Sequence, residues 1–99
     1  MKSSKLLQLG FQPQFVSEEE SGGTPYIYYT RDYTPSLSFI TDAFDYEGNI
    51  NDKNDTLKET MRKESEYEYK VGVFDDNIFL EEKDAIELIT LLNKIYANG

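Results

Sequence analysis

The chain of 99 residues contains no cysteine, no histidine and no tryptophan. Without cysteine it forms no disulfide and no thiolate metal site, which fits a reducing compartment. Without histidine it holds neither a Ser-His-Asp triad nor an imidazole metal ligand. Catalysis would have to depend on carboxylate, Tyr, Lys, Ser or Thr side chains alone. The sequence therefore predicts a protein that is not an enzyme.

Basic side chains are also scarce. Ten Lys and Arg residues stand against 19 Asp and Glu residues, which gives a net charge of −9. Nucleic acids and anionic membrane surfaces attract clustered Lys and Arg, so direct binding to either is not expected. The apolar run in residues 5–11 is too short for a signal peptide, and no window is long enough for a transmembrane span. These features predict a cytoplasmic protein.

What the chain does have is aromatic bulk. Hydrophobic residues make up 38% of the sequence and include eight Tyr and six Phe. Rings bury large areas, and a chain of this length hides about two-thirds of its unfolded surface when it folds. Residues 1–99 are therefore expected to form a single folded domain.

Strand signals occur in two pairs. Residues 26–33 and 36–44 are rich in aromatic and β-branched side chains and flank a turn at Pro35, which predicts an antiparallel hairpin. Residues 66–74 alternate acidic or small residues with Tyr and Val, the pattern of a strand with one solvated side. Residues 78–80 form a short returning strand after a turn.

Helix signals lie at both ends. Ser3 or Ser4 caps a short helix that Gly10 ends, with Leu6, Leu7 and Phe11 facing inward. A longer helix over residues 81–99 has an apolar stripe of Ala85, Leu88, Ile89, Leu92, Ile95 and Tyr96. Residues 56–59 match a capping box, which leaves open a short helix or an irregular excursion between strands. The predicted fold is α+β: an antiparallel sheet of about four strands, with the C-terminal helix packed on one face and a short N-terminal helix.

No motif in the sequence indicates a metal or a cofactor. Residues 45–56 offer alternating oxygen ligands, but Ile50 and Thr56 stand where a calcium loop needs Gly and a bidentate Glu. The adjacent carboxylates Glu81 and Glu82 are explained by a helix start. No phosphate-binding loop or dinucleotide fingerprint is present. We expect no bound cofactor and no metal.

A row of acids remains to be explained. On the expected strand the side chains of Glu64, Glu66 and Glu68 share the outward face. One interpretation is a solvated face that prevents edge-to-edge aggregation; the other is a surface that meets a positively charged partner. Tyr side chains near Arg31 either fill the core or anchor an interface. The candidate partner-binding residues are Glu64, Glu66, Glu68, Asp75, Asp76, Tyr28 and Tyr33.

Residues 6–11, LLQLGF, and the hairpin and helix of residues 69–96 resemble small acidic α+β proteins of phages and mobile elements, among them anti-CRISPR inhibitors. The resemblance implies action in the host cytoplasm on a nucleic-acid-handling protein, such as a CRISPR effector, whose basic surface the carboxylates and Tyr residues would occupy. The alternative is a structural or oligomerising accessory protein, such as a homodimer, held together by an apolar face that includes Ile86 and Leu91.

Overall fold

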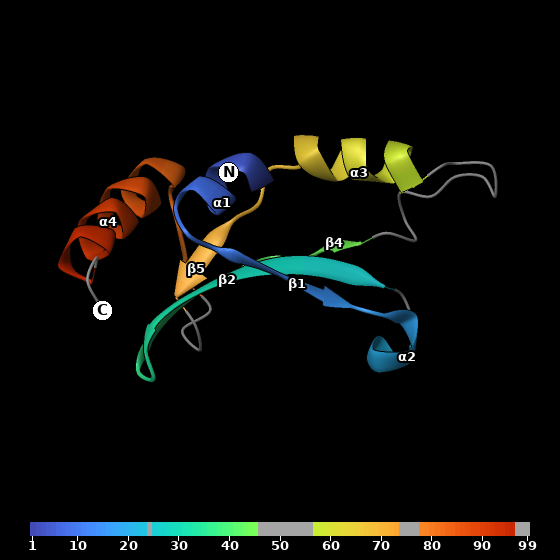
Figure 1. Cartoon of the computed structure of the whole chain (residues 1–99), viewed down its shortest axis with the longest axis horizontal. Coiled ribbons are helices and arrows are strands. Elements are labelled where there is room, and N and C mark those ends of the chain that lie inside the picture. The colour runs from blue at the N-terminus through green and yellow to red at the C-terminus, as the bar shows by residue number, and fades with distance from the viewer. Residues whose placement is uncertain (24, 46–56, 74–77, 97–99) are drawn as a thin grey trace.

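The structure is a computed structural model that describes residues 1–23, 25–45, 57–73 and 78–96 (Figure 1). Its helices are α1 (Ser3–Gln8), α2 (Glu18–Ser21), α3 (Leu57–Glu66) and α4 (Glu82–Ile95). Its strands are β1 (Gln12–Val16), β2 (Tyr26–Thr34), β3 (Leu37–Thr41), β4 (Phe44–Asp45), β5 (Val71–Val73) and β6 (Ile78–Leu80). The predicted α+β class, with an antiparallel sheet and a helix near each end of the chain, is confirmed.

The sheet has the order β1-β2-β3-β5-β6, and β4 pairs with β2 beside this path. All pairs are antiparallel. β3 pairs with one end of the long strand β2 and β4 pairs with the other. The described residues thus form six strands instead of about four, because the sequence marks β1 only weakly and β4 is two residues long.

Helices α1, α3 and α4 lie on one side of the sheet, which we call the inner face (Figure 1). Strand alternation turns Tyr29 of β2 and Phe39 of β3 toward these helices, and both are buried. Leu6 of α1 and Ile89 of α4 are fully buried against the same layer. The core therefore lies between the sheet and the helices, in agreement with the predicted packing of the C-terminal helix.

The first helix ends at a glycine, as predicted. Gly10 has φ of 95°, a left-handed conformation that glycine adopts without strain, and its N–H donates to the carbonyl of Leu7. The turn lets Phe11 pack into the core. Leu7 is exposed and Leu9 is buried instead, so the predicted inward position of Leu7 is wrong. No side chain caps the helix, whose cap residue is Lys2 rather than a serine.

A break between β3 and β4 is closed by side-chain hydrogen bonds. At this break, Thr41 Oγ1 accepts a hydrogen bond of 2.9 Å from the backbone N–H of Tyr29 and donates one of 2.8 Å to the carbonyl of Asp42. The N–H of Asp42 donates to the carbonyl of Lys70, in the segment before β5. The buried hydroxyl thus replaces a ladder bond that the interrupted strand does not supply.

The strand predicted over residues 66–74 is wrong in its first half. α3 continues through Glu66, and within the described residues only Val71–Val73 join the sheet here. Tyr69 donates its N–H to the carbonyl of Met1, so this stretch of backbone bonds to the N-terminal segment. The helix that the sequence left open at residues 56–59 is present from Leu57 onward, and residue 56 lies outside the described residues.

The C-terminal helix is confirmed, but its apolar surface exceeds what the core covers. Ala85 and Ile89 are fully buried, whereas Leu88 and Ile95 are exposed, contrary to the expected inward stripe. Ile86, expected beside the stripe, is half-buried and packs against the core. The helix therefore presents unburied apolar side chains to its surroundings.

Replacing Gly72 by Ala should destabilise the fold. A Cβ at this position would lie 2.7 Å from the carbonyl oxygen of Ile78 on the neighbouring strand β6, a backbone atom that moves only if the pairing moves. We expect the free energy of unfolding to fall by about 1–3 kcal/mol, the range for overpacked sites. Urea denaturation measures it, with Gly23→Ala as the control because a Cβ there meets nothing within 4 Å. Equal stability of the two variants would contradict the close approach of β5 and β6.

Candidate partner-binding surface

The first predicted partner-binding residue, Glu64, is half-buried and hydrogen-bonded within the protein. Glu64 Oε1 accepts a hydrogen bond of 3.1 Å from the hydroxyl of Tyr29 and one of 2.7 Å from the hydroxyl of Tyr69. Both tyrosines are buried, and a buried hydroxyl needs an acceptor. The carboxylate of Glu64 therefore joins α3 to the inner face of the sheet.

The two tyrosines belong to a cluster of rings. Tyr69 contacts Tyr29 edge to face at 5.2 Å between ring centroids and Tyr67 at 4.7 Å, and Tyr67 contacts Phe44 at 5.4 Å. The hydroxyl of Tyr67 donates a 2.7 Å hydrogen bond to Asp42. This hydrogen bond raises the pKa of Tyr67 to about 12, and burial of the phenol and the negative charge of Asp42 contribute to the rise.

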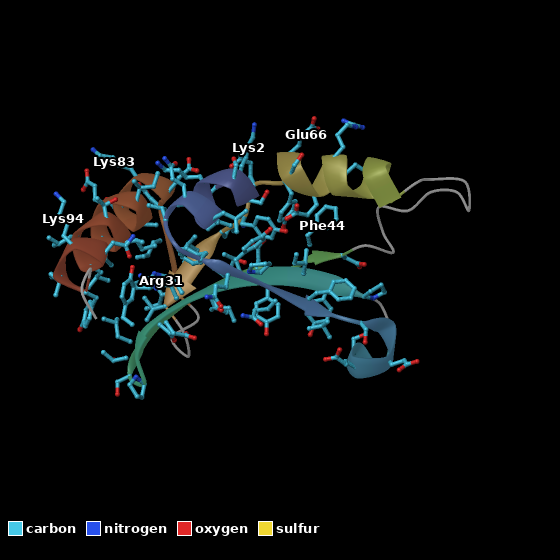
Figure 2. The ribbon with its side chains drawn as sticks, viewed as in Figure 1. Lys2, Arg31, Phe44, Glu66, Lys83 and Lys94 are labelled. Carbon is cyan, nitrogen blue, oxygen red and sulfur yellow. The ribbon has the colours of Figure 1, made fainter. Side chains whose placement is uncertain are left out.

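Glu66 and Glu68 are exposed, as expected, but each lies close to a positive charge. Glu66 is the last residue of α3 and lies 3.3 Å from the guanidinium of Arg62, one turn earlier (Figure 2). Glu68 lies 3.0 Å from the amino group of Met1, which also contacts Glu82 at 3.3 Å. The prediction that Glu64, Glu66 and Glu68 share one strand face is wrong, because a helix ends between them and turns them in different directions.

Tyr33 also has an internal role. Its hydroxyl donates a 2.6 Å hydrogen bond to Asn93 Oδ1 on α4, and its ring lies 4.4 Å below the guanidinium of Arg31. Arg31 donates to the same Asn93 oxygen at 3.0 Å, and Asn93 donates to the carbonyl of Leu9. Burial raises the pKa of Tyr33, and the neighbouring guanidinium opposes that rise. This network joins α4 to β2 and to the end of α1.

Tyr28 lies on the other side of the sheet. It follows Ile27 and precedes the buried Tyr29, so alternation places it on the face opposite the three helices, which we call the outer face. Its ring is stacked with that of Tyr26 at 6.1 Å between centroids. Tyr28 therefore shares no surface with Glu66 or Glu68. The remaining predicted residues, 75 and 76, lie outside the described residues, as do residues 46–56 of the oxygen-rich segment considered for calcium.

Strand registry defines the outer face. Its described side chains are Gln12, Gln14, Val16, Tyr26, Tyr28, Thr30, Asp32, Ser38, Ile40, Asp45 and Phe79. Two of these are carboxylates and none is Lys or Arg. Neither Asp32 nor Asp45 is among the predicted partner-binding residues. The sequence does indicate the position of Asp32. It lies four residues after Tyr28 in the same predicted strand, so both side chains are expected on the same face of the sheet.

The outer face is hollowed near the β2–β3 turn. An open cavity of about 480 Å³ is lined by Thr30, Asp32, Tyr33, Thr34, Pro35, Ser38 and Phe39. A register shift between Asp32 and Thr34 bends the hairpin at this point. Its lining residues include one carboxylate, Asp32, and the hydroxyl-bearing Thr30, Thr34 and Ser38, together with the apolar Pro35 and Phe39.

Three further findings bear on the chemistry of the chain. In residues 1–23, 25–45, 57–73 and 78–96, no three Asp or Glu side chains come together as a metal site. No helix in those ranges has the length and apolarity to cross a membrane. Comparison of the chain with protein-family models, with curated proteins and with solved structures gave no match.

Removing the carboxylate of Glu64 should destabilise the protein. Glu64→Ala leaves the hydroxyls of Tyr29 and Tyr69 without this acceptor, and we expect a loss of about 1–3 kcal/mol in the free energy of unfolding. Glu66→Ala is the control on the same helix, because an exposed ion pair is worth at most about 1 kcal/mol. Thermal and urea denaturation of both variants measure the difference. A cost no larger for Glu64 than for Glu66 would contradict the internal position of Glu64.

Alkaline pH should weaken the fold through Tyr67. In the unfolded chain its phenol loses a proton near pH 10, whereas in the folded protein it keeps the proton to about pH 12. The unfolded state therefore binds fewer protons between these values, and the free energy of unfolding falls as the pH rises from 10 to 12. Tyr67→Phe should show a shallower fall over that range. Tyr28→Phe is the control, and an identical slope for wild type and Tyr67→Phe would contradict the prediction.

Proposed function

We propose that this chain is a small non-catalytic binding protein that meets a positively charged protein surface through the outer face of its sheet. The observation that carries the proposal is the composition of that face: Tyr26, Tyr28, Asp32 and Asp45 are among its described side chains, and no Lys or Arg is. This surface retains the expected carboxylate and Tyr chemistry. The carboxylates of the proposed binding surface are therefore the aspartates of the sheet and not the glutamates of residues 64–68.

Charge distribution supports this choice of face. On the helix side, acidic side chains alternate with basic ones, including Lys2, Lys83 and Lys94, which project from α1 and α4 (Figure 2). Neighbouring opposite charges largely cancel each other's field, and salt screens the remainder over a Debye length of about 8 Å at physiological ionic strength. The described strand positions of the outer face include no Lys or Arg. A partner rich in Lys or Arg would therefore be attracted to this side of the sheet.

The aromatic residues supply the second part of the argument. Tyr26 and Tyr28 are half-buried and stacked, so their rings are held in place before a partner binds. Fixed Tyr rings lose little conformational freedom on binding and are enriched among residues that dominate binding energy. Tyr with flanking carboxylates suits Arg side chains in particular, because a guanidinium both stacks on a ring and pairs with a carboxylate.

The partner class follows from this chemistry. Proteins that handle nucleic acids present Lys and Arg grooves to phosphate, and an acidic, Tyr-bearing face competes for such a groove. The resemblance to small phage and mobile-element proteins favours the same target. We propose inhibition or modulation of a nucleic-acid-handling protein, such as a CRISPR effector, with no direct contact between this chain and the nucleic acid.

An NMR titration with an oligo-arginine peptide tests which face binds. We expect chemical-shift changes around Tyr28 and Asp32, reduced at high salt. The variant Tyr28→Ala with Asp32→Asn should weaken binding by roughly tenfold, whereas the helix-side control Glu66→Gln with Glu68→Gln should bind like wild type. Shift changes centred on α3 or α4, or equal weakening by both variants, would overturn the choice of the outer face.

A pull-down tests the partner class. The wild-type chain and the two double variants serve as baits in nuclease-treated lysate of the host, so that any capture is independent of nucleic acid. We expect wild type and the helix-side control to capture a nucleic-acid-handling protein that high salt elutes. The outer-face variant should not capture it. Retention by all three baits, or capture that nuclease abolishes, would contradict the proposal.

A further inference from the structure

Unburied apolar side chains are concentrated on the last strand and the last helix. Three of them, Leu88, Leu91 and Ile95, are 38%, 55% and 63% exposed and follow each other along α4 at spacings of three and four residues. Residues at these spacings share one face of a helix. We call these three residues the α4 stripe. Ile78 and Phe79 of β6 are also more than half exposed.

The stripe points away from β2. Asn93 of α4 points toward β2, where it accepts hydrogen bonds from Arg31 and Tyr33. Residues two apart lie on nearly opposite sides of a helix, so Leu91 and Ile95 point away from β2. β6 lies at the opposite end of the strand order from β1 and β2. Of the two exposed residues of β6, the strand registry places Ile78 on the inner face, the side on which α4 lies, and Phe79 on the outer face.

The charges beside the stripe are self-complementary. Glu87 and Lys94 each precede a stripe residue by one position and flank the stripe on the same side. When two α4 helices pack antiparallel about a two-fold axis, Leu88 of one meets Leu91 of the other, and Glu87 of one lies beside Lys94 of the other. A parallel pair would place Glu87 and Lys94 of one copy on the opposite side of the contact from those of the other, so these charges would not pair.

We propose that the α4 stripe is the interface of a homodimer in which two copies of this chain pack their α4 helices antiparallel. A second copy fits this surface because a two-fold axis brings its apolar centre and both flanking charges into register at once. A partner of another sequence would have to match the same pattern independently. The outer face points elsewhere, so each subunit of the dimer would still present it.

The size of the interface sets the expected strength. A helix of 14 residues is about 21 Å long, so the α4 contact is smaller than the roughly 800 Å² per partner of a standard interface. We therefore expect a concentration-dependent equilibrium between monomer and dimer. Its apolar centre should make the dimer persist at high salt.

Sedimentation equilibrium over a range of protein concentrations tests the dimer. Leu91→Glu should raise the dissociation constant by at least about tenfold, since it places a charge in the centre of the contact. Leu7→Glu is the matched control, because Leu7 of α1 is 53% exposed and lies outside the stripe. A protein that stays monomeric at all concentrations, or a dimer that both variants weaken equally, would overturn the proposal.

Charge reversal tests the antiparallel arrangement without depending on a folding defect. Glu87→Lys and Lys94→Glu should each weaken the dimer, because each brings like charges together, and the double variant should restore it. Circular dichroism of the monomers checks that α4 is intact. Single reversals without effect, or a double variant as weak as the singles, would exclude the antiparallel contact.

Discussion

The carboxylate of Glu64, held between the hydroxyls of Tyr29 and Tyr69, is the contact on which the placement of α3 over the sheet depends. Buried hydroxyls need an acceptor, and an acidic residue at this position supplies one for two rings at once. Asn93 has the corresponding role for α4, since it binds Arg31 and Tyr33 of β2. Both contacts are on the inner face, which draws these helices to one side of the sheet.

This one-sided arrangement separates the charges of the molecule. Several acidic residues on the helix side bond within the protein or pair with a cation, as Glu64, Glu66 and Asp42 do. The described outer face keeps its carboxylates without a basic residue among its strand positions. A net charge of −9 does not reveal this difference, because total charge contains no information about which side chains lie together. The proposed binding face follows from the distribution of charge and not from its sum.

Local signals predicted those elements that local forces decide. The turn at Pro35, the left-handed Gly10 and the helical spacing in α4 each depend on residues close together in the chain, and all three appear where expected. The prediction failed over residues 66–70. Alternation there does turn Tyr67 and Tyr69 inward, but a strand also needs a neighbouring strand to pair with. The backbone of Tyr69 forms hydrogen bonds with Met1 instead, and these join residues 68 positions apart in the chain.

The sequence by itself determined the α+β class, the absence of thiol and imidazole side chains, and the acidic, aromatic character of the chain, because these follow from composition and short-range periodicity. Only the tertiary structure decided which acids and tyrosines lie at the surface. Glu64 and Glu66 are two residues apart, yet one is an internal acceptor and the other is exposed. Burial and hydrogen bonding of a side chain depend on what the fold brings opposite it. For Glu64, that is a tyrosine 35 residues away.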